Sequence, residues 1–309
     1  MTIKSMQAVG QVGFLTALSR FLGLAREIAV ASILGTSILS DAFTIAFLIP
    51  NLCRRLFAEG TLVSIFIPFI KEIENKSGRN QAFDFAANCF WIVALFSFFF
   101  CVVLFALTPE LLKHGLAIGF DESLLKVTTV LSRIMIGYLF FIFLAAVFQG
   151  VLNSQSVFWV PSFTPLILNL SVIVGAIIVA PYFKNPAIIL SVCVLFGGFL
   201  QFVFQIPFAK KVGFRLLIPI NFQDPYLKQI LTKSLPSIFG AGVYQINIVV
   251  GTAIASWLYS GAASSLKFSN RLIEFMIGVV VVSLTTVLLP AVSEKFIKRE
   301  FTSLSESLG

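Results

Sequence analysis

The sequence predicts an all-α polytopic membrane protein with eight transmembrane helices. Hydrophobic residues make up 58% of the 309 residues and charged residues 12%, whereas an ordinary soluble domain has roughly 25% charged residues. The mean hydropathy is +0.98. Apolar runs of about 18 residues or more recur along the chain, and the alternating pattern of a membrane β-barrel is absent. Because a backbone in lipid must satisfy its own hydrogen bonds, these runs predict helices.

Eight apolar runs give the predicted spans, and each is long enough to cross a hydrocarbon core of about 30 Å. They cover roughly residues 8–34, 41–70, 83–107, 125–152, 158–181, 186–209, 230–258 and 264–293. Pro50 interrupts the second run. The first run contains Arg20, Arg26 and Glu27, which the apolar region of a signal peptide excludes, so we interpret it as a retained span.

The Lys and Arg residues between the spans predict the orientation. With the N-terminus inside, the outer loops carry only Lys113, Lys126 and Lys184. The inner segments carry twelve such residues: Lys4, Lys71, Lys76, Arg79, Lys210, Lys211, Arg215, Lys228, Lys233, Lys295, Lys298 and Arg299. This bias predicts that both ends of the chain are cytoplasmic.

Other functional classes are disfavoured by what the sequence lacks. The net charge of +8 could suggest nucleic acid, but there is no basic arm and the cations fall between apolar runs. Enzyme motifs are absent, and Gly197-Gly198 lies mid-span, where small residues let helices approach closely. His114 is the only histidine, and the four cysteines form no pair motif. We expect no enzyme activity, no metal or cofactor and no nucleic acid partner.

Three predicted spans carry polar stripes along one helical face. In the first span the stripe covers an arc of about 80° and Arg26 lies to its side. The members are Gly13, Thr16, Arg20, Gly23 and Glu27 in the first span; Asp41, Arg55 and Glu59 in the second, if it is straight; and Ser264, Lys267, Arg271, Glu274, Gly278 and Thr285 in the eighth. Charges in a membrane are costly unless they face partners or water, so the stripes predict a shared hydrated interior.

The charge balance of these stripes predicts an anionic ligand. The cations are Arg20, Arg26, Arg54, Arg55, Lys267 and Arg271, and the acids are Glu27, Asp41, Glu59 and Glu274. The surplus of two cations favours an anion, and arginine suits phosphate through its bidentate fork. The alternative is internal ion pairing that only fixes how the helices pack.

A short internal repeat predicts the domain organisation. Residues 65–72, IFIPFIKE, resemble residues 287–294, VLLPAVSE, at an offset of 222. If the match is not a chance one, the seventh and eighth spans repeat the first and second, and six-span parallel repeats are a transporter architecture. We therefore expect a six-helix lobe over 1–225 and the beginning of a second lobe over 226–309, as in a chain truncated at its C-terminus.

These residues resemble the MviN/MurJ family of lipid II flippases, in the multidrug/oligosaccharidyl-lipid/polysaccharide exporter superfamily. The resemblance covers nearly the whole chain. It rests on Ser19-Arg20-x-Leu22-Gly23-x-x-Arg26, Asp41-Ala42-Phe43, Pro50-Asn51-Leu52-x-Arg54-Arg55-x-Phe57-Ala58-Glu59-Gly60, Leu152-Asn153 with Pro161 to Asn169, Gly197-Gly198-x-Leu200-Gln201-x-x-x-Gln205-x-Pro207 with Lys210-Lys211, and Asn270-Arg271-Leu272-x-Glu274-Phe275.

The resemblance implies fourteen helices, arranged as two six-helix lobes and two further helices. It implies movement of the undecaprenyl-pyrophosphate-linked peptidoglycan precursor across the bacterial cytoplasmic membrane. In the family, the arginines that match Arg20, Arg26, Arg54 and Arg271 line the central cavity, and an acid that matches Asp41 is also required. One departure is Asn270, where the family usually has an acid; another is Thr61-Leu62-Val63-Ser64, which is less polar than usual.

The mechanism we expect is alternating access, in which the arginines capture the pyrophosphate and the polyprenyl tail stays in lipid. Gly23, Gly35, Pro50 and Gly60 are candidate bending points, and Asn270 is a candidate gate residue. Membrane potential or an ion gradient resets the cycle, and the sequence does not identify the ion. Two alternatives stay open: an exporter of another polysaccharide-lipid or drug, and a non-transporting remnant. The remaining helices of the second lobe could be a separately encoded partner.

Overall fold

The computed structural model describes residues 3–56, 62–216 and 220–276. Every regular element in these ranges is helical, so the all-α prediction is confirmed for the part of the chain that is described. The chain divides into two compact units, Met1–Lys267 and Phe268–Gly309, and each is considered by itself. The second copy of the predicted repeat, residues 287–294, lies outside the described residues.

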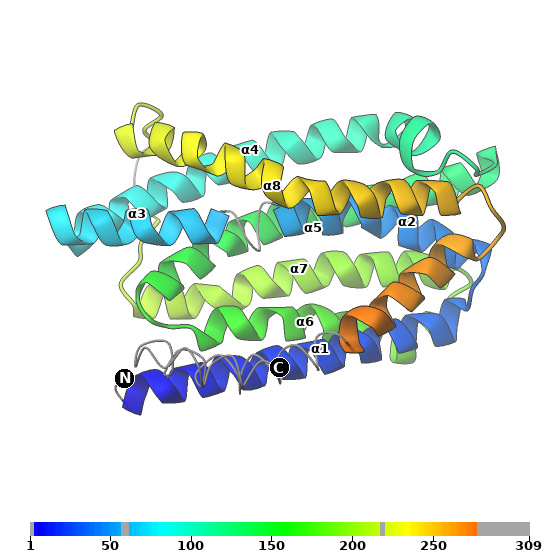
Figure 1. The fold of residues 1–309 in the computed structure, drawn as a ribbon, viewed down its shortest axis with the longest axis horizontal. Helices are drawn as coiled ribbons and strands as arrows, with labels where there is room; N and C mark the ends of the chain where they lie inside the picture. Colours follow the sequence, from blue (N-terminus) through cyan, green and yellow to red (C-terminus); the bar gives the residue numbers. More distant parts are fainter. Residues whose placement is uncertain (1–2, 57–61, 217–219, 277–309) are drawn as a thin grey trace, which may run out of the picture. The chain divides into compact units, whose positions relative to one another are not determined.

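The first unit is built from long helices joined by short connections (Figure 1). The α-helices are α1 (Ile3–Leu34), α2 (Ile38–Cys53), α3 (Leu62–Ser77), α4 (Arg79–Leu111), α5 (Glu122–Ser154), α6 (Trp159–Val174), α7 (Pro186–Lys211) and α8 (Pro225–Ala255). Shorter helical turns are η2 (Leu112–Leu116), which extends α4, and η3 (Gly175–Val179) and η4 (Ala180–Tyr182), which extend α6. A further helix covers 262–276.

Helix ends follow local chemistry that the sequence contains. Ser37, Asp121 and Asp224 precede α2, α5 and α8, and each side chain accepts a backbone N–H from the first turn. Such caps satisfy N–H groups that have no partner inside the helix. After α1, Gly35 adopts a φ of +61°, a left-handed conformation that glycine tolerates and that ends many helices.

The predicted second span, 41–70, is two helices of 16 residues each in the structure. Pro50 is not the point of interruption, because α2 continues through it to Cys53. The backbone changes to a π-helical turn over 54–56, and residues 57–61 lie outside the described part. A proline removes one backbone donor, and a helix that is packed on its neighbours can absorb that loss.

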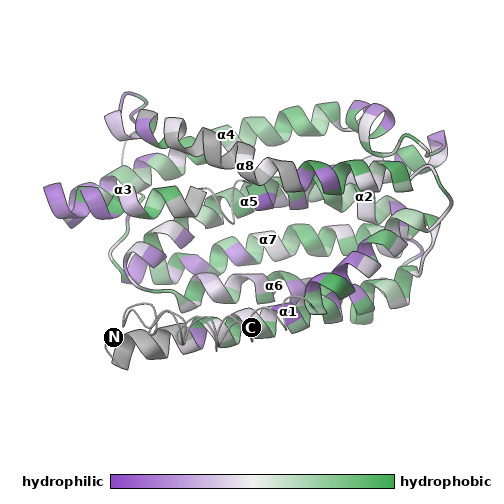
Figure 2. Ribbon diagram, viewed as in Figure 1, coloured by the Kyte–Doolittle hydropathy of each residue, from purple (hydrophilic) through white to green (hydrophobic). Residues whose placement is uncertain are grey.

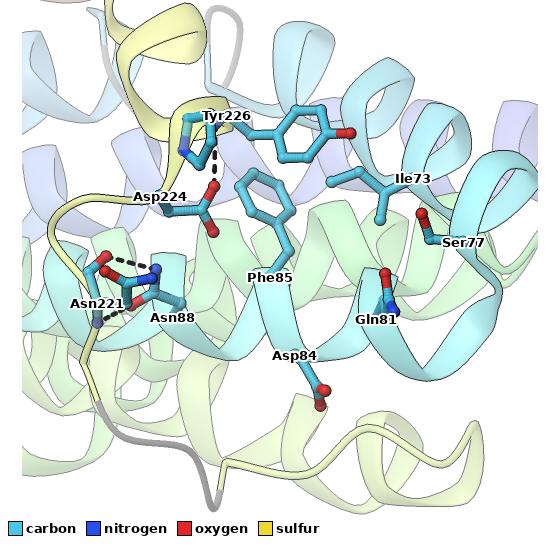
Figure 3. A pocket seen from close by; sticks show the side chains of 10 residues that line it. Ile73, Ser77, Gln81, Asp84, Phe85, Asn88, Asn221, Asp224 and Tyr226 are labelled. Atoms are coloured by element: carbon cyan, nitrogen blue, oxygen red, sulfur yellow. Dashed lines mark hydrogen bonds between the residues drawn. The ribbon is translucent and has the colours of Figure 1, made fainter.

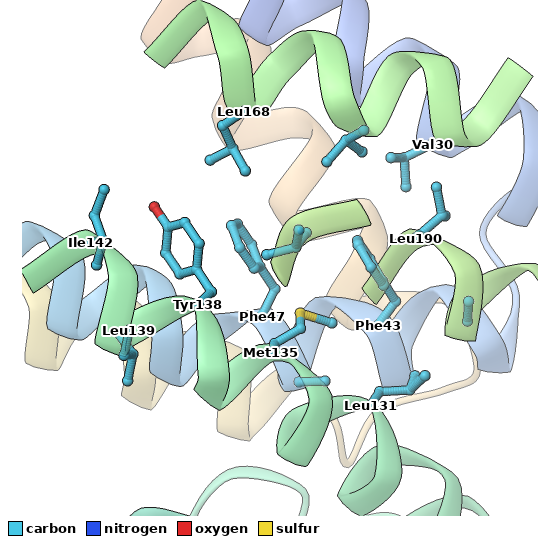
Figure 4. Packing of buried hydrophobic residues seen from close by; sticks show 14 of the residues in the cluster. Val30, Phe43, Phe47, Leu131, Met135, Tyr138, Leu139, Ile142, Leu168 and Leu190 are labelled. Atoms are coloured by element: carbon cyan, nitrogen blue, oxygen red, sulfur yellow. The ribbon is translucent and has the colours of Figure 1, made fainter. Parts of the chain in front are cut away.

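Helix α5 is central to the first unit, because α2, α3, α4 and α7 all pack against it, while α1 packs mainly on α6. The core between α1, α2, α5, α6 and α7 contains Tyr138, Met135, Phe43 and Phe47 among aliphatic side chains (Figure 4). Gly198 of α7 lies directly against the Tyr138 ring, and Gly197 lies against α6. This confirms the prediction that the glycine pair permits close helix packing.

Four described helical segments are long and apolar enough to cross a membrane: Arg79–Leu116, Glu122–Ser154, Trp159–Tyr182 and Pro186–Lys211. Figure 2 shows hydrophobic residues along them and hydrophilic residues toward the end of α3. A multi-pass membrane protein is therefore confirmed. The number of eight spans stays a prediction, since α2 and α3 are short and the eighth predicted span is described only as far as residue 276.

Candidate functional site

A buried ionic cluster joins α1 to the helix over 262–276. Glu27 of α1 is only 5% exposed. Arg26 Nη2 lies 2.5 Å from Glu27 Oε1, and Lys267 Nζ lies 2.9 Å from Glu27 Oε2. Two cations therefore share one carboxylate, which leaves one positive charge in excess at this point. Removal of the carboxylate would leave both cations uncompensated in a low-dielectric environment.

Aromatic rings of α2 line the same cluster. The Arg26 guanidinium lies 5.9 Å from the centre of the Phe47 ring, and Lys267 Nζ lies 5.6 Å from the centre of the Phe43 ring. Ring faces attract cations, so these contacts add to the ion pairs with Glu27. The space enclosed by this cluster is about 10 Å³, which is room for about one water molecule. In this conformation the charges pack against each other and leave no volume for a pyrophosphate.

Asp41 makes a second buried contact with the same helix. The backbone N–H of Gly261 donates to Asp41 Oδ2 at 2.5 Å, and that of Ser264 donates to Asp41 Oδ1 at 2.8 Å. Asp41 is 3% exposed. Its carboxylate thus caps the start of the 262–276 helix from a distant part of the chain, where the helix dipole favours a negative charge. We call the contacts of Glu27 and Asp41 with Gly261, Ser264 and Lys267 the 261–267 junction.

Gly261 gives this junction a backbone conformation that suits only glycine. Its φ of +94° is a conformation that other residues adopt only with strain. A Cβ at this position would overlap the carbonyl oxygen of Thr36, in the turn between α1 and α2. The backbone at Gly261 therefore packs directly against the backbone of the turn between α1 and α2. This close approach brings the Gly261 N–H within reach of Asp41.

The other predicted arginines of the first unit lie on α1 and in the turn that follows α2. Arg20 is exposed on α1, six positions before Arg26. Arg54 donates from Nη2 to Asn51 Oδ1 at 2.9 Å, and Arg55 follows it in the π-helical turn after α2, half-buried. The structure thus unites Arg26 and Lys267 on one acid, while the exposed Arg20 is not part of that cluster.

The structure describes some of the remaining predicted site residues and leaves others outside the described ranges. In the second unit Arg271 Nη1 lies 3.3 Å from Glu274 Oε2, and Asn270 is exposed. Glu59 and Gly60 lie outside the described residues. Gly23 is buried within an unbroken α1, so this conformation has no bend there.

Two motifs of the family resemblance have packing roles. Asn169 of α6 donates from Nδ2 to the carbonyl of Ser19 on α1 at 3.2 Å. Gln201 of α7 donates from Nε2 to the carbonyl of Thr164 on α6 at 2.7 Å. Both side chains are buried. These amides therefore fix α1 and α7 to α6 and do not belong to the ionic cluster.

A larger pocket of about 320 Å³ lies elsewhere, between α3, α4 and the segment that enters α8 (Figure 3). Its lining contains Phe85 and Tyr226 together with amide and carboxyl groups, and none of the predicted site residues. Next to it, Asn88 Nδ2 donates to the carbonyl of Asn221, and the Asn221 N–H donates to Asn88 Oδ1, each at 2.8 Å.

Two further bonds hold the same entering segment to α4. Arg79 Nη2 donates to the carbonyl of Val212 at 2.7 Å, and Trp91 Nε1 donates to the carbonyl of Leu216 at 2.9 Å. We call the contacts of Arg79, Asn88 and Trp91 with the backbone of 212–221 the 212–221 junction. This junction and the backbone partners of Asp41 are not predicted by the sequence, because backbone acceptors and donors carry no residue-type signal.

Comparison with known families decides which family this arrangement represents. The family model described as lipid II flippase MurJ matches residues 30–308. The chain belongs to the lipid II flippase MurJ family. The family resemblance inferred from the arginine-rich motif is thereby confirmed, as is the expectation of a transporter family rather than an enzyme family.

Curated members of the family are similar along most of this chain. The probable lipid II flippase MurJ of Buchnera aphidicola subsp. Acyrthosiphon pisum is 34% identical over 298 residues, which is 95% of this chain and 58% of that protein. The lipid II flippase MurJ of Burkholderia cenocepacia is 37% identical over 300 residues, 93% of this chain and 57% of that protein. The chain thus spans somewhat more than half the length of these relatives.

Solved structures agree on the fold. A lipid II flippase MurJ in an inward closed conformation superposes with a TM-score of 0.77 at 27% identity, over 94% of this chain and 59% of that chain. An inward-facing multidrug resistance MATE family transporter of the MOP superfamily superposes with a TM-score of 0.69 at 13% identity, over 94% of this chain and 68% of that chain. The second likeness concerns the fold alone. Family and apolar helices together identify a multi-pass protein of the bacterial inner membrane.

Proposed function

We propose that this chain takes part in flipping lipid II, the undecaprenyl-pyrophosphate-linked peptidoglycan precursor, across the cytoplasmic membrane. The observation that carries the proposal is the buried cluster in which Arg26 and Lys267 share Glu27. Family membership and the lipid II flippase activity for which the relatives are named support the same substrate. The pyrophosphate is an anion of the kind that a surplus of cations between apolar helices would bind.

In the proposed binding step, the pyrophosphate of the substrate takes the place of the Glu27 carboxylate beside the cations. In the closed cluster Glu27 holds Arg26 and Lys267. When the helices separate, pyrophosphate oxygens replace part of that carboxylate's role, and an arginine fork can bind them in a bidentate manner. We assign Arg20, Arg54, Arg55 and Arg271 to the path that leads to this point. The polyprenyl tail remains in lipid.

We propose that the transport cycle works by alternating access, and the position of the 261–267 junction supports this proposal. Asp41 and Glu27 hold the start of the 262–276 helix against α1 and α2, so this end of the bundle is closed. We propose that the junction opens on the outer side of the membrane after the substrate has entered from the cytoplasm. Both chain ends are cytoplasmic in this proposal, and membrane potential or an ion gradient resets the cycle.

The opposing lobe is the partner that this cycle requires. The relatives extend well beyond the length that this chain matches. We propose that the remaining helices close on the substrate from the other side, whether they are joined to this chain or encoded separately.

Binding and transport are tested separately. In the binding assay, the purified chain in detergent is mixed with undecaprenyl pyrophosphate and the bound fraction is measured by native mass spectrometry. We expect Arg26→Ala to weaken binding about tenfold or more, since it removes a charge-assisted pair. Lys184→Ala is the matched control, because it removes one exposed cation of the α6–α7 connection, which is not part of the cluster. Equal binding by Arg26→Ala and the parent chain would contradict the proposed site.

Transport is tested by growth of cells depleted of their own flippase. The chain is expressed alone and fused to the C-terminal part of a family member. Rescue by the fusion and not by the chain alone supports the need for an opposing lobe. Full rescue by Arg20→Ala, Arg26→Ala and Arg54→Ala versions of the rescuing protein would refute the idea that these side chains carry the substrate.

A further inference from the structure

Arg133 lies on the outside of the helix bundle, away from the ionic cluster. It belongs to α5, the most central helix, but its side chain is only partly buried and lies against Phe105 of α4. Exposed apolar side chains occur on α5 and on the two helices that pack most on it: Val130 of α5, Val102 and Phe105 of α4, and Val192 and Phe196 of α7. Figure 1 shows α5 between α4 and α7, and Figure 2 shows all three helices as largely hydrophobic. A cation on a lipid-facing surface needs a partner.

The protein itself satisfies only part of this arginine. Arg133 Nε donates to the carbonyl of Phe105 at 3.2 Å, and the guanidinium lies 4.6 Å from the centre of the Phe105 ring. These contacts hold the guanidinium against α4. A guanidinium has five N–H donors, so its fork stays available to an acceptor that approaches from the lipid.

The side chain of Arg133 can reach toward the level of the lipid phosphates. Helix α5 has 33 residues and is therefore about 50 Å long, about 20 Å more than a hydrocarbon core. Arg133 comes eleven residues after Glu122, about 16 Å from the start of the helix, which is about 6 Å inside the apolar layer if α5 is centred. Helical side chains point toward the N-terminus, which is here the nearer end, so the guanidinium extends toward the headgroups.

A second cation lies on the same face nearer the end. Lys126 is seven residues, or two turns, before Arg133, with Val130 between them. The acids at this end have local partners: Glu110 lies beside His114, and Asp121 caps α5. Glu122 is exposed and one turn before Lys126. The face therefore presents apolar surface for acyl chains and two cations in line for a headgroup.

We propose that the face formed by Lys126, Val130 and Arg133 binds the headgroup phosphate of an anionic bilayer phospholipid. The lipid lies in the leaflet at the end of the bundle where α4 ends and α5 begins. Its phosphate accepts from the Arg133 fork, its acyl chains lie along Phe105 and Val192, and Lys126 contacts the outer part of the headgroup. The site is independent of the cargo that the chain moves.

The test measures phosphatidylglycerol bound to the purified chain in detergent by native mass spectrometry, with phosphatidylcholine as the zwitterionic comparison. We expect Arg133→Gln to lower retained phosphatidylglycerol about fivefold or more, since one charge-assisted contact is removed. Arg133→Lys retains most of the binding. Lys184→Gln, which removes one cation at the same end of the bundle, leaves it unchanged. Circular dichroism checks that each variant keeps its helical content.

Location is tested with a phosphatidylglycerol that carries a photoreactive headgroup. Crosslinks are expected in the peptide that contains 122–137 and should disappear in Arg133→Gln. Three results would overturn the proposal: unchanged lipid retention in Arg133→Gln, an equal loss in Lys184→Gln, or crosslinks only elsewhere. A shift from dimer to monomer in Arg133→Gln, without a change in lipid, would overturn it in favour of a protein interface.

Discussion

The segments on either side of α8 are held to the other helices by two junctions of different chemistry. The 261–267 junction uses the buried carboxylates of Glu27 and Asp41. The 212–221 junction uses an amide pair, an indole N–H and one arginine, all directed at backbone groups of a more exposed segment. Both connect residues that are far apart in sequence, and the difference lies in burial and charge.

This difference predicts how each junction responds to damage. A buried charge that loses its partner stays uncompensated, which costs far more than the intact pair contributes. An exposed backbone group that loses a partner can bond to water at little cost. We therefore expect the 261–267 junction to open as a unit and the 212–221 junction to loosen one bond at a time. Such a contrast suits a protein in which one end of the bundle opens in a defined step.

Glu27→Gln should cause the largest loss of stability. The change removes the carboxylate that pairs with both Arg26 and Lys267, and breaking a buried pair in this way costs about 3–5 kcal/mol. Thermal unfolding in detergent micelles measures the loss. The double variant Glu27→Gln with Lys267→Met should recover part of it, because one of the two uncompensated cations is gone. A loss no larger than that of an exposed pair would mean that the cluster is hydrated rather than buried.

Asp41→Asn should have the next largest effect. The amide can accept one of the two backbone N–H groups, but its own NH₂ must then face the other donor. Hydrogen bonds to a charged acceptor contribute about 1.5–3 kcal/mol, and we expect a loss of about 2–3 kcal/mol. Asp84→Asn is the matched control, because Asp84 is an exposed acid on α4 and its loss should change stability little. Similar losses in the two variants would show that the cap adds nothing specific.

Gly261→Ala tests the backbone geometry of the same junction. The φ of +94° alone is unfavourable for alanine by about 1–2 kcal/mol, and the new Cβ would also displace the Thr36 carbonyl. Gly251→Ala is the control within α8, where a Cβ meets no neighbour and should stabilise the helix by about 0.5–1 kcal/mol. Equal and small effects at both glycines would show that the turn at Gly261 adapts freely.

The two junctions also separate what the sequence predicts from what it cannot. The helices follow from apolar runs, and the predicted stripes of charged residues contain Glu27 and Lys267, whose side chains are in contact in the structure. The helical wheel places Arg26 to the side of the stripe, yet its long side chain reaches the adjacent Glu27, which Cα positions do not reveal. The partners of Asp41 are backbone N–H groups 220 and 223 residues away, and no residue type marks them. Likewise, no residue type marks the end of the α-helical backbone after Cys53, and Pro50 is the more obvious candidate for a break in the sequence.

Asn88→Ala tests the weaker junction. It removes two hydrogen bonds to Asn221, but Asn221 is exposed and water can replace them, so we expect a loss of only about 1 kcal/mol. Trp91→Phe removes one bond to the Leu216 carbonyl and keeps most of the ring, so its effect should be smaller still. Hydrogen exchange of the 214–222 amides provides the local measurement. If Asn88→Ala destabilised the chain as much as Glu27→Gln, the contrast between the junctions would be lost.

The ion pair between Lys71 and Glu74 on α3 should contribute the least to stability among the interactions compared. Glu74 lies 2.8 Å from Lys71 Nζ, near the hydrophilic end of α3, and Gln155 at the end of α5 also approaches it. The hydrogen bond from Lys71 lowers the pKa of Glu74, against a small opposing effect of burial. A lowered pKa in the folded state means that the unfolded chain binds the proton more readily. The contribution is therefore present above the unfolded pKa of about 4.3 and is lost as the pH falls through the lower folded value.

Glu74→Gln should therefore cost about 0.5 kcal/mol at pH 7 and progressively less in acid, as expected for a surface pair. Unfolding of parent and variant in micelles at a series of pH values from 7 to about 3 measures the difference, which should narrow as the parent's Glu74 is protonated. The difference should also shrink in high salt, because exposed charges are screened. The buried pair of Glu27 and Lys267 should keep its effect under the same salt, since little solvent reaches it. Equal salt sensitivity of the two carboxylates would remove burial as the reason that the 261–267 junction is the stronger one.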